Sequence, residues 1–153
     1  MKKVLVLCIL TAFLTGCGNK SNSSVTECTM DKQYSAYTTS KQTLESEGDI
    51  VKVILFEGII DYSSKEQLES AIVQIDAAIE SVNSLDGVEV SYEKLSDTSI
   101  KDKARYDLES ASISTLQQLG LLSSDDAAKE TKLISLKKSV TALESSGFTC
   151  KTK

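Results

Sequence analysis

The sequence contains no histidine, no proline and no tryptophan. Without histidine there can be no Ser-His-Asp or Cys-His catalytic arrangement, and the most common side-chain metal ligand is missing. Without proline there is no cis-proline turn and no proline-rich recognition segment. Serine and lysine are plentiful, but no spacing singles out a catalytic pair. We therefore expect a non-enzymatic protein with no catalytic residue, no metal site and no dissociable cofactor.

The first 16 residues have the layout of a signal peptide. Two lysines precede an uncharged stretch over residues 4–14, and small residues come before Cys17. A basic start, an apolar run and small residues at a cut are typical of an export signal. The run is shorter than the roughly 20 residues of a membrane-spanning helix, so we expect it to be removed rather than retained.

The residues around the cut are similar to a bacterial lipobox. The order Leu14-Thr15-Gly16-Cys17 gives an aliphatic residue, a small residue, a glycine and a cysteine. This resemblance implies cleavage between Gly16 and Cys17 and a diacylglyceryl thioether on Cys17, and it allows an N-acyl chain on the same residue. We predict a signal peptide over 1–16, a lipidated cysteine with a flexible tether over 17–24, and one domain over 25–153.

Charge also limits the partners of the chain. Acidic side chains outnumber basic ones by 22 to 17, and the formal net charge is −5. Nucleic acids and anionic lipid surfaces both attract clustered lysine and arginine. We expect no nucleic-acid partner, and we expect the lipid on Cys17 to supply the membrane contact.

Two cysteines remain for the folded domain, because Cys8 leaves with the signal peptide and Cys17 takes lipid. These are Cys28 and Cys150, near opposite ends of the domain. An even pair in an exported protein suggests a disulfide, which here would close a loop of roughly 120 residues and stabilise by about 4 to 5 kcal/mol. A metal pair and a free thiol are the alternatives, but a metal site needs more ligands than two cysteines supply.

Strand-forming residues and turn signals predict six strands. The predicted strands cover 25–30, 34–44, 50–62, 88–92, 99–108 and 148–151. Within them, β-branched and aromatic residues are frequent, and the breaks contain glycine, aspartate or serine. We expect an antiparallel meander, a later hairpin and a short closing strand.

Three helices are predicted between these strands. A capping box at Ser63 and Glu66 opens the strongest one, which ends near Ser84, and a short helix over 113–119 closes at Gly120. A last helix begins at Ser123 or Ser124, carries Asp125 and Asp126 in its first turn, buries Leu133, Leu136, Val140 and Leu143, and stops at Gly147. The expected fold class is α+β, a single antiparallel sheet covered by two main helices and a short one.

Other groups of residues offer weaker candidate sites. Glu45, Glu47 and Asp49, like the Asp125-Asp126 pair, lack the ligand spacing of a calcium loop, and helix capping or a solvated turn explains them better. The apolar stripe of the first helix is more typical of a core face than of a partner groove. Tyrosines can line a carbohydrate or peptide surface, although sheets collect tyrosine in any case. The tyrosines are Tyr34, Tyr37, Tyr62, Tyr92 and Tyr106.

The order of these features resembles the YehR-like small bacterial lipoproteins, a family of unknown function. The lipobox, the strand entry at 48–52, Gly87-Val88-Glu89 and the ending over 144–148 carry the resemblance. It covers the whole mature domain and implies one sheet covered by helices. It provides no catalytic or ligand-binding residue, and the pair of Cys28 and Cys150 occurs in only some members.

These observations predict a lipoprotein of the cell envelope that binds a partner. We expect a monomer whose partner is an envelope protein or cell-wall material, with a small-ligand carrier holding a pocket between sheet and helices as the alternative. Gly18 follows Cys17 where an inner-membrane retention signal would have aspartate. The predicted location is therefore the outer membrane in a two-membrane host, or the outer face of the plasma membrane in a one-membrane host.

Overall fold

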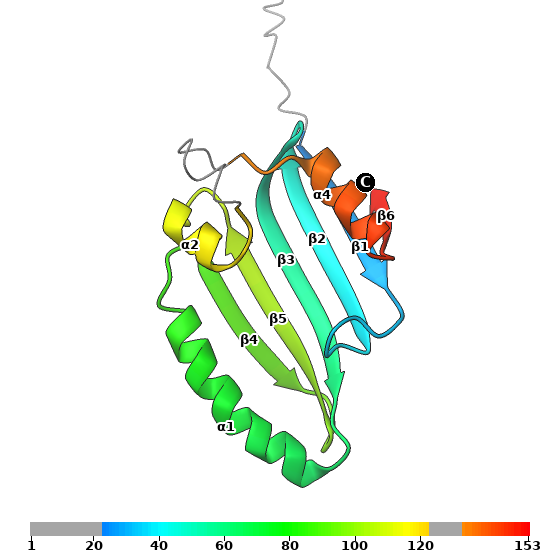
Figure 1. Cartoon of the computed structure of the whole chain (residues 1–153), viewed down its shortest axis with the longest axis vertical. Coiled ribbons are helices and arrows are strands. Elements are labelled where there is room, and N and C mark those ends of the chain that lie inside the picture. The colour runs from blue at the N-terminus through cyan, green and yellow to red at the C-terminus, as the bar shows by residue number, and fades with distance from the viewer. Residues whose placement is uncertain (1–22, 123–132) are drawn as a thin grey trace, which may run out of the picture.

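The computed structural model describes residues 23–122 and 133–153 (Figure 1). The predicted signal peptide, the lipidation site at Cys17 and the predicted helix start at 123–126 lie outside these ranges. They remain predictions from the sequence.

Six strands form one open antiparallel sheet in the order β4-β5-β3-β2-β1-β6. The strands are β1 (Ser23–Met30), β2 (Thr39–Glu47), β3 (Ile50–Asp61), β4 (Val88–Lys94), β5 (Ser99–Asp107) and β6 (Thr149–Thr152). The predicted meander and hairpin are therefore present, and the short closing strand pairs with β1.

Two strand starts differ from the sequence prediction. β1 begins at Ser23, because Ser23 and Ser24 pair with the end of β2. β2 begins only at Thr39, because Tyr34 and Tyr37 bond to each other through their backbones across a tight turn in which Ser35 has a φ of 56°. The backbone hydrogen bonds within this turn therefore replace the strand pairing that the strand-forming residues from Tyr34 onward predicted.

Three helices are described: α1 (Lys65–Val82), α2 (Ile113–Gln118) and α4 (Leu136–Ser145). Figure 1 shows α2 and α4 over one face of the sheet, near the end where β1 starts, and α1 alongside β4. The fold therefore belongs to the α+β class, and the sheet makes up most of it. The two main helices and the short one cover only part of that face, and Leu68 is the buried residue of α1.

The segment before α4 differs from the sequence prediction, because residues 133–135 do not continue a helix and α4 begins at Leu136. Ser135 caps the helix, its hydroxyl accepting the Lys138 N–H at 3.2 Å. Just before it, the Val51 N–H donates to the Ile134 carbonyl at 2.9 Å, which holds this segment extended beside β3. The prediction that Leu133 lies on the buried face of a helix is wrong, since it precedes the helix and is 65% exposed.

The main core lies between the sheet and the α2 and α4 helices. Leu44, Val51 and Ile54 come from β2 and β3, and Leu116 comes from α2. Partly buried residues of α4 pack against this group, so apolar area removed from water stabilises the arrangement. None of the described helices combines the length and the apolarity needed to cross a bilayer.

Candidate functional site

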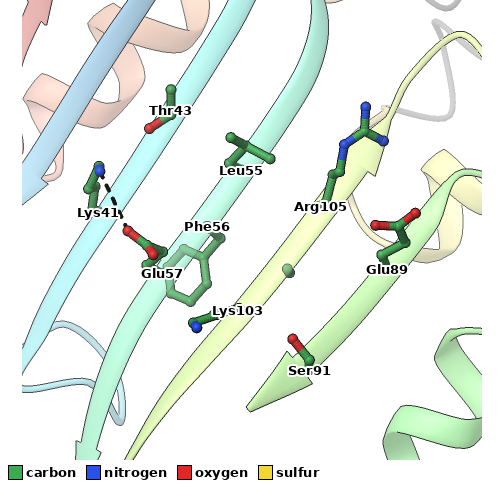
Figure 2. A pocket seen from close by; sticks show the side chains of 10 residues that line it. Lys41, Thr43, Leu55, Phe56, Glu57, Glu89, Ser91, Lys103 and Arg105 are labelled. Atoms are coloured by element: carbon green, nitrogen blue, oxygen red, sulfur yellow. Dashed lines mark ion pairs between the residues drawn. The ribbon is translucent and has the colours of Figure 1, made fainter. Parts of the chain in front are cut away.

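The face of the sheet opposite to α2 and α4 carries a shallow hollow. Figure 2 views this face, on which the strands appear in the reverse order from Figure 1 and α2 and α4 lie behind them. The hollow has a volume of about 340 Å³ and extends across four strands, from β2 to β4. Its lining residues are Lys41, Thr43, Leu55, Glu57, Glu89, Ser91, Lys103 and Arg105, together with Phe56 and Ala104, whose side chains alternate to the other face.

Strand register places the polar side chains of the hollow in two rows. In one row Lys41 lies opposite Glu57, and Glu57 opposite Lys103. The other row joins Thr43, Leu55, Arg105 and Glu89 from the four strands. Alternate residues of a strand point to the same face, so these two rows lie side by side along the strands.

Ion pairs connect the charges of this face. The Lys41 ammonium lies 3.5 Å from the Glu57 carboxylate, as Figure 2 shows, and 3.6 Å from that of Glu27. Lys103 bonds to Glu93 at 2.7 Å. This hydrogen bond raises the pKa of the Lys103 ammonium and lowers the pKa of the Glu93 carboxyl, so both groups are charged at neutral pH.

These charges remain accessible to a partner. The side chains of Lys41, Lys103 and Arg105 are 41%, 41% and 40% exposed. Exposed ion pairs contribute only about 0 to 1 kcal/mol each to stability. The charged side chains can therefore exchange these pairs for contacts with a partner at a small cost in free energy. Leu55, between Thr43 and Arg105, adds an apolar contact. The arrangement can form ion pairs with a charged chain.

The predicted disulfide is present in the structure. Cys28 of β1 and Cys150 of β6 are direct partners in the antiparallel ladder and are joined through their sulfur atoms. Their Cα atoms are 4.0 Å apart. The bond therefore ties the short last strand to the first strand, as predicted for the two cysteines left to the domain.

Asp49 has a structural role that fits the helix-capping explanation. Its carboxylate accepts the Ser135 hydroxyl and the Lys137 backbone N–H, each at 2.8 Å, at the start of α4. These two hydrogen bonds lower the pKa of the Asp49 carboxyl. Within residues 23–122 and 133–153, no three histidine, cysteine or carboxylate side chains gather in a way that could hold a metal.

Four of the five tyrosines lie on the helix-bearing face of the sheet, and Tyr34 lies apart from them. Tyr34 packs edge-to-face on Phe148, with ring centroids 5.2 Å apart. Tyr92 and Tyr106 lie on the other face of the sheet from the hollow, because they alternate along β4 and β5 with Ser91 and Arg105.

Sequence reasoning missed the charged face of the sheet. The alternation Lys101, Lys103, Arg105 along the predicted strand 99–108 was a signal that could have revealed it. The cross-strand partners Glu57 and Glu89 could not be assigned without the register.

Comparison with known proteins identifies a shared fold. No family model matches the chain, and no curated protein matches it. Among solved structures it is similar to an NMR structure of a protein from Streptococcus pneumoniae TIGR4, with 13% identity, coverage of 99% of each chain and a TM-score of 0.60. It is also similar to the NMR structure of Escherichia coli YehR, with 17% identity, coverage of 86% of this chain and 92% of that one, and a TM-score of 0.62. Identities this low show the fold alone.

Proposed function

We propose that this protein is a lipid-anchored envelope protein of the YehR-like type that binds a charged partner, an envelope protein or cell-wall peptide, at the hollow of its open sheet face. The observation that carries the proposal is the hollow itself, across four strands, with cations and carboxylates in adjacent rows. The lipobox and Cys17 support the anchor, and the similarity of fold to YehR supports the family.

The charge pattern favours a partner with charges of both signs. Arg105 and Glu89 lie opposite each other on β5 and β4, and Lys41 lies across the hollow from them. A purely anionic partner would meet the carboxylates of Glu57 and Glu89, which disfavours it by like-charge repulsion. An extended peptide that carries both carboxylates and amines can match the two rows.

A small-ligand carrier is supported less well. The space between the sheet and the α2 and α4 helices holds seven buried core residues. These are Leu44, Val51, Ile54, Leu108, Ala111, Leu116 and Leu122. Side chains packed together at this position leave less room for a ligand than an open sheet face does.

The anchor is tested first. Cells that express the chain are labelled with radioactive palmitate, and the labelled protein is compared with a Cys17→Ser variant. We expect label in the parent chain and none in the variant. Equal labelling of both chains, or labelling of neither, contradicts the proposed anchor.

Partner binding is then tested by cross-linking in whole cells, followed by identification of the attached material. We expect Lys103→Glu and Arg105→Glu to reduce the cross-linked product at least about tenfold, as removal of one or two good charged contacts does. Lys65→Glu, an equal charge change on α1, is the matched control and should retain the product. The same yield from all variants contradicts a partner at the hollow.

A further inference from the structure

Four aromatic side chains lie around one carboxylate on the helix-bearing face of the sheet. In the ladder, Asp102 of β5 lies between Gly58 of β3 and Tyr92 of β4. Tyr106 lies four residues further along β5 and therefore on the same face. Tyr37, Tyr62, Tyr92 and Tyr106 are called the tyrosine cluster below.

Tyr37 is fixed on this face by three contacts. Its hydroxyl donates to Oδ2 of Asp102 at 2.8 Å, and its ring packs edge-to-face on Phe56 with centroids 4.9 Å apart. The ring also lies directly over Gly58, where an added Cβ would be 2.8 Å from Cε1 of Tyr37. Burial and the bond to Asp102 raise the pKa of the Tyr37 hydroxyl, which therefore stays protonated as a donor.

The other members of the cluster lie near the same negative charge. Burial raises the pKa of the Tyr62 and Tyr106 hydroxyls, and the charge of Asp102 raises both further. The backbone N–H of Tyr62 donates to the Thr98 carbonyl at 2.7 Å, which places this residue beside the β4–β5 turn. Burial and the nearby carboxylate of Asp76 of α1 raise the pKa of the Tyr92 hydroxyl, so a second carboxylate borders the cluster.

No basic side chain neutralises this carboxylate in the described part of the chain. Asp102 belongs to none of the ion pairs found there, and its chain neighbours Lys101 and Lys103 point to the opposite face. The adjacent helix α1 is itself acidic, with one lysine against four carboxylates: Lys65, Glu66, Glu69, Asp76 and Glu80.

The cluster is also accessible. Asp102, Tyr37, Tyr62, Tyr92 and Tyr106 are all half-buried rather than buried. In Figure 1 no helix crosses in front of β3 and β5 over their half nearest the β4–β5 turn. Aromatic rings and a carboxylate therefore reach the surface together.

We propose that Asp102 and the tyrosine cluster bind an organic ammonium group. A cation is attracted to the face of an aromatic ring and to a carboxylate, and partial burial strengthens both interactions. Asp102 can accept a further hydrogen bond, because a carboxylate has more acceptor sites than the one bonded to Tyr37. The ammonium can belong to a peptide amine or to a quaternary lipid headgroup. This site is on the other face from the hollow and does not depend on the anchor.

The test is an NMR titration of the full mature chain, residues 17–153, carrying Cys17→Ser so that it stays unacylated. The probes are methylammonium, tetramethylammonium and 3,3-dimethylbutanol, a neutral molecule shaped like choline. We expect saturable shifts of the amide signals around Asp102 and Tyr92 with at least one ammonium probe and none with the neutral one. Binding of methylammonium points to a peptide amine, and binding of tetramethylammonium points to a quaternary headgroup.

Variants separate charge from shape. Asp102→Asn keeps an acceptor for Tyr37 but removes the charge, and we expect binding at least about tenfold weaker. Tyr37→Phe keeps the ring, so its effect should be smaller. Glu93→Gln removes a carboxylate from the opposite face of β4 and should bind like the parent. Equal shifts with the neutral probe, no shifts with either ammonium, or unchanged affinity in Asp102→Asn would overturn the proposal. If Asp102→Asn does not fold, Tyr92→Ala is titrated in its place. Weaker ammonium binding by Tyr92→Ala is then expected, and unchanged affinity would overturn the proposal.

Discussion

The side chain of Asn83 pairs with the backbone of Val90 as a neighbouring strand would. The Val90 N–H donates to Oδ1 of Asn83 at 2.6 Å, and Nδ2 of Asn83 donates to the Val90 carbonyl at 2.9 Å. Asn83 is the C-cap residue of α1, and β4 is an edge strand of the sheet. The asparagine therefore blocks part of an edge to which another strand could otherwise bind.

Replacing Asn83 should weaken the fold and open this edge. Asn83→Ala removes two hydrogen bonds that are open to solvent, and we expect unfolding by urea to show a loss of about 1 kcal/mol. Light scattering at high protein concentration should also show more self-association, because the Val90 backbone becomes available. Ser84→Ala, which removes only a local hydroxyl bond to Ser81, is the control and should associate no more than the parent chain. Similar association of both variants contradicts the blocking role.

Acid should weaken the attachment of α4 through Asp49. Its two hydrogen bonds hold the pKa of the folded carboxyl below the ordinary value of 3.8. A lowered folded pKa gives stability that is present above the unfolded pKa and is lost as pH falls through the folded value. Asp49→Asn should therefore lower the melting temperature at pH 7, and this effect should shrink as the pH falls below the ordinary value of 3.8.

The melting curves of Asp49→Asn and its parent should be compared between neutral and acid pH. Asp31→Asn changes another exposed aspartate, in the loop before β2, and is the control. A difference between Asp49→Asn and the parent that stays constant over the whole range contradicts the role of the ionised carboxyl.

The strands and α1 could be predicted because their signals are local. Alternation along the strands depends on neighbouring residues, and so does the start of α1. The predicted capping box at Ser63 and Glu66 is one residue too early, because Ser64 is the N-cap and its hydroxyl accepts the Gln67 N–H. The start of α4 could not be predicted in this way. It depends on Asp49, which lies 86 residues before Ser135 in the chain and reaches it only through the fold.

The candidate sites depend even more on long-range pairing. The sequence shows that Asp102 and Tyr106 share a face once β5 is predicted, but not that Tyr37 reaches Asp102 across 65 residues. In the same way, β5 shows a row of cations, whereas its match with Glu57 and Glu89 follows from the register. Cysteines were easier to pair, because Cys28 and Cys150 are the two left for the domain.

Loss of the disulfide should release β6. Cys28→Ser with Cys150→Ser removes a link across 122 positions, for which the chain-entropy model gives about 4 to 5 kcal/mol. We expect a lower urea midpoint and faster hydrogen exchange at residues 149–152, while β3 and β5 keep their protection because their partners do not involve β6. Reductant should weaken the parent and leave the double variant unchanged. An equal effect of reductant on both proteins contradicts the role assigned to the bond.

The ring of Tyr37 should make replacement of Gly58 by alanine costly in the parent chain but much less so in a Tyr37→Ala variant. A Cβ at Gly58 would lie 2.8 Å from Cε1 of Tyr37 and 2.9 Å from Cζ of Phe56, so Gly58→Ala forces a ring to move and should cost about 1 to 3 kcal/mol. Without the Tyr37 ring most of this clash disappears, and alanine suits a strand better than glycine does.

The parent, the two single variants and the double variant form a double-mutant cycle measured by urea unfolding, in which we expect a coupling of at least about 1 kcal/mol. Gly48→Ala strains the backbone at a turn with a φ of 59° but meets no neighbour within 4 Å, so its cost should not depend on Tyr37. If the effects of Gly58→Ala and Tyr37→Ala are additive, the Tyr37 ring does not lie over Gly58 of β3. The position of Tyr37 beside Asp102 would then be contradicted as well.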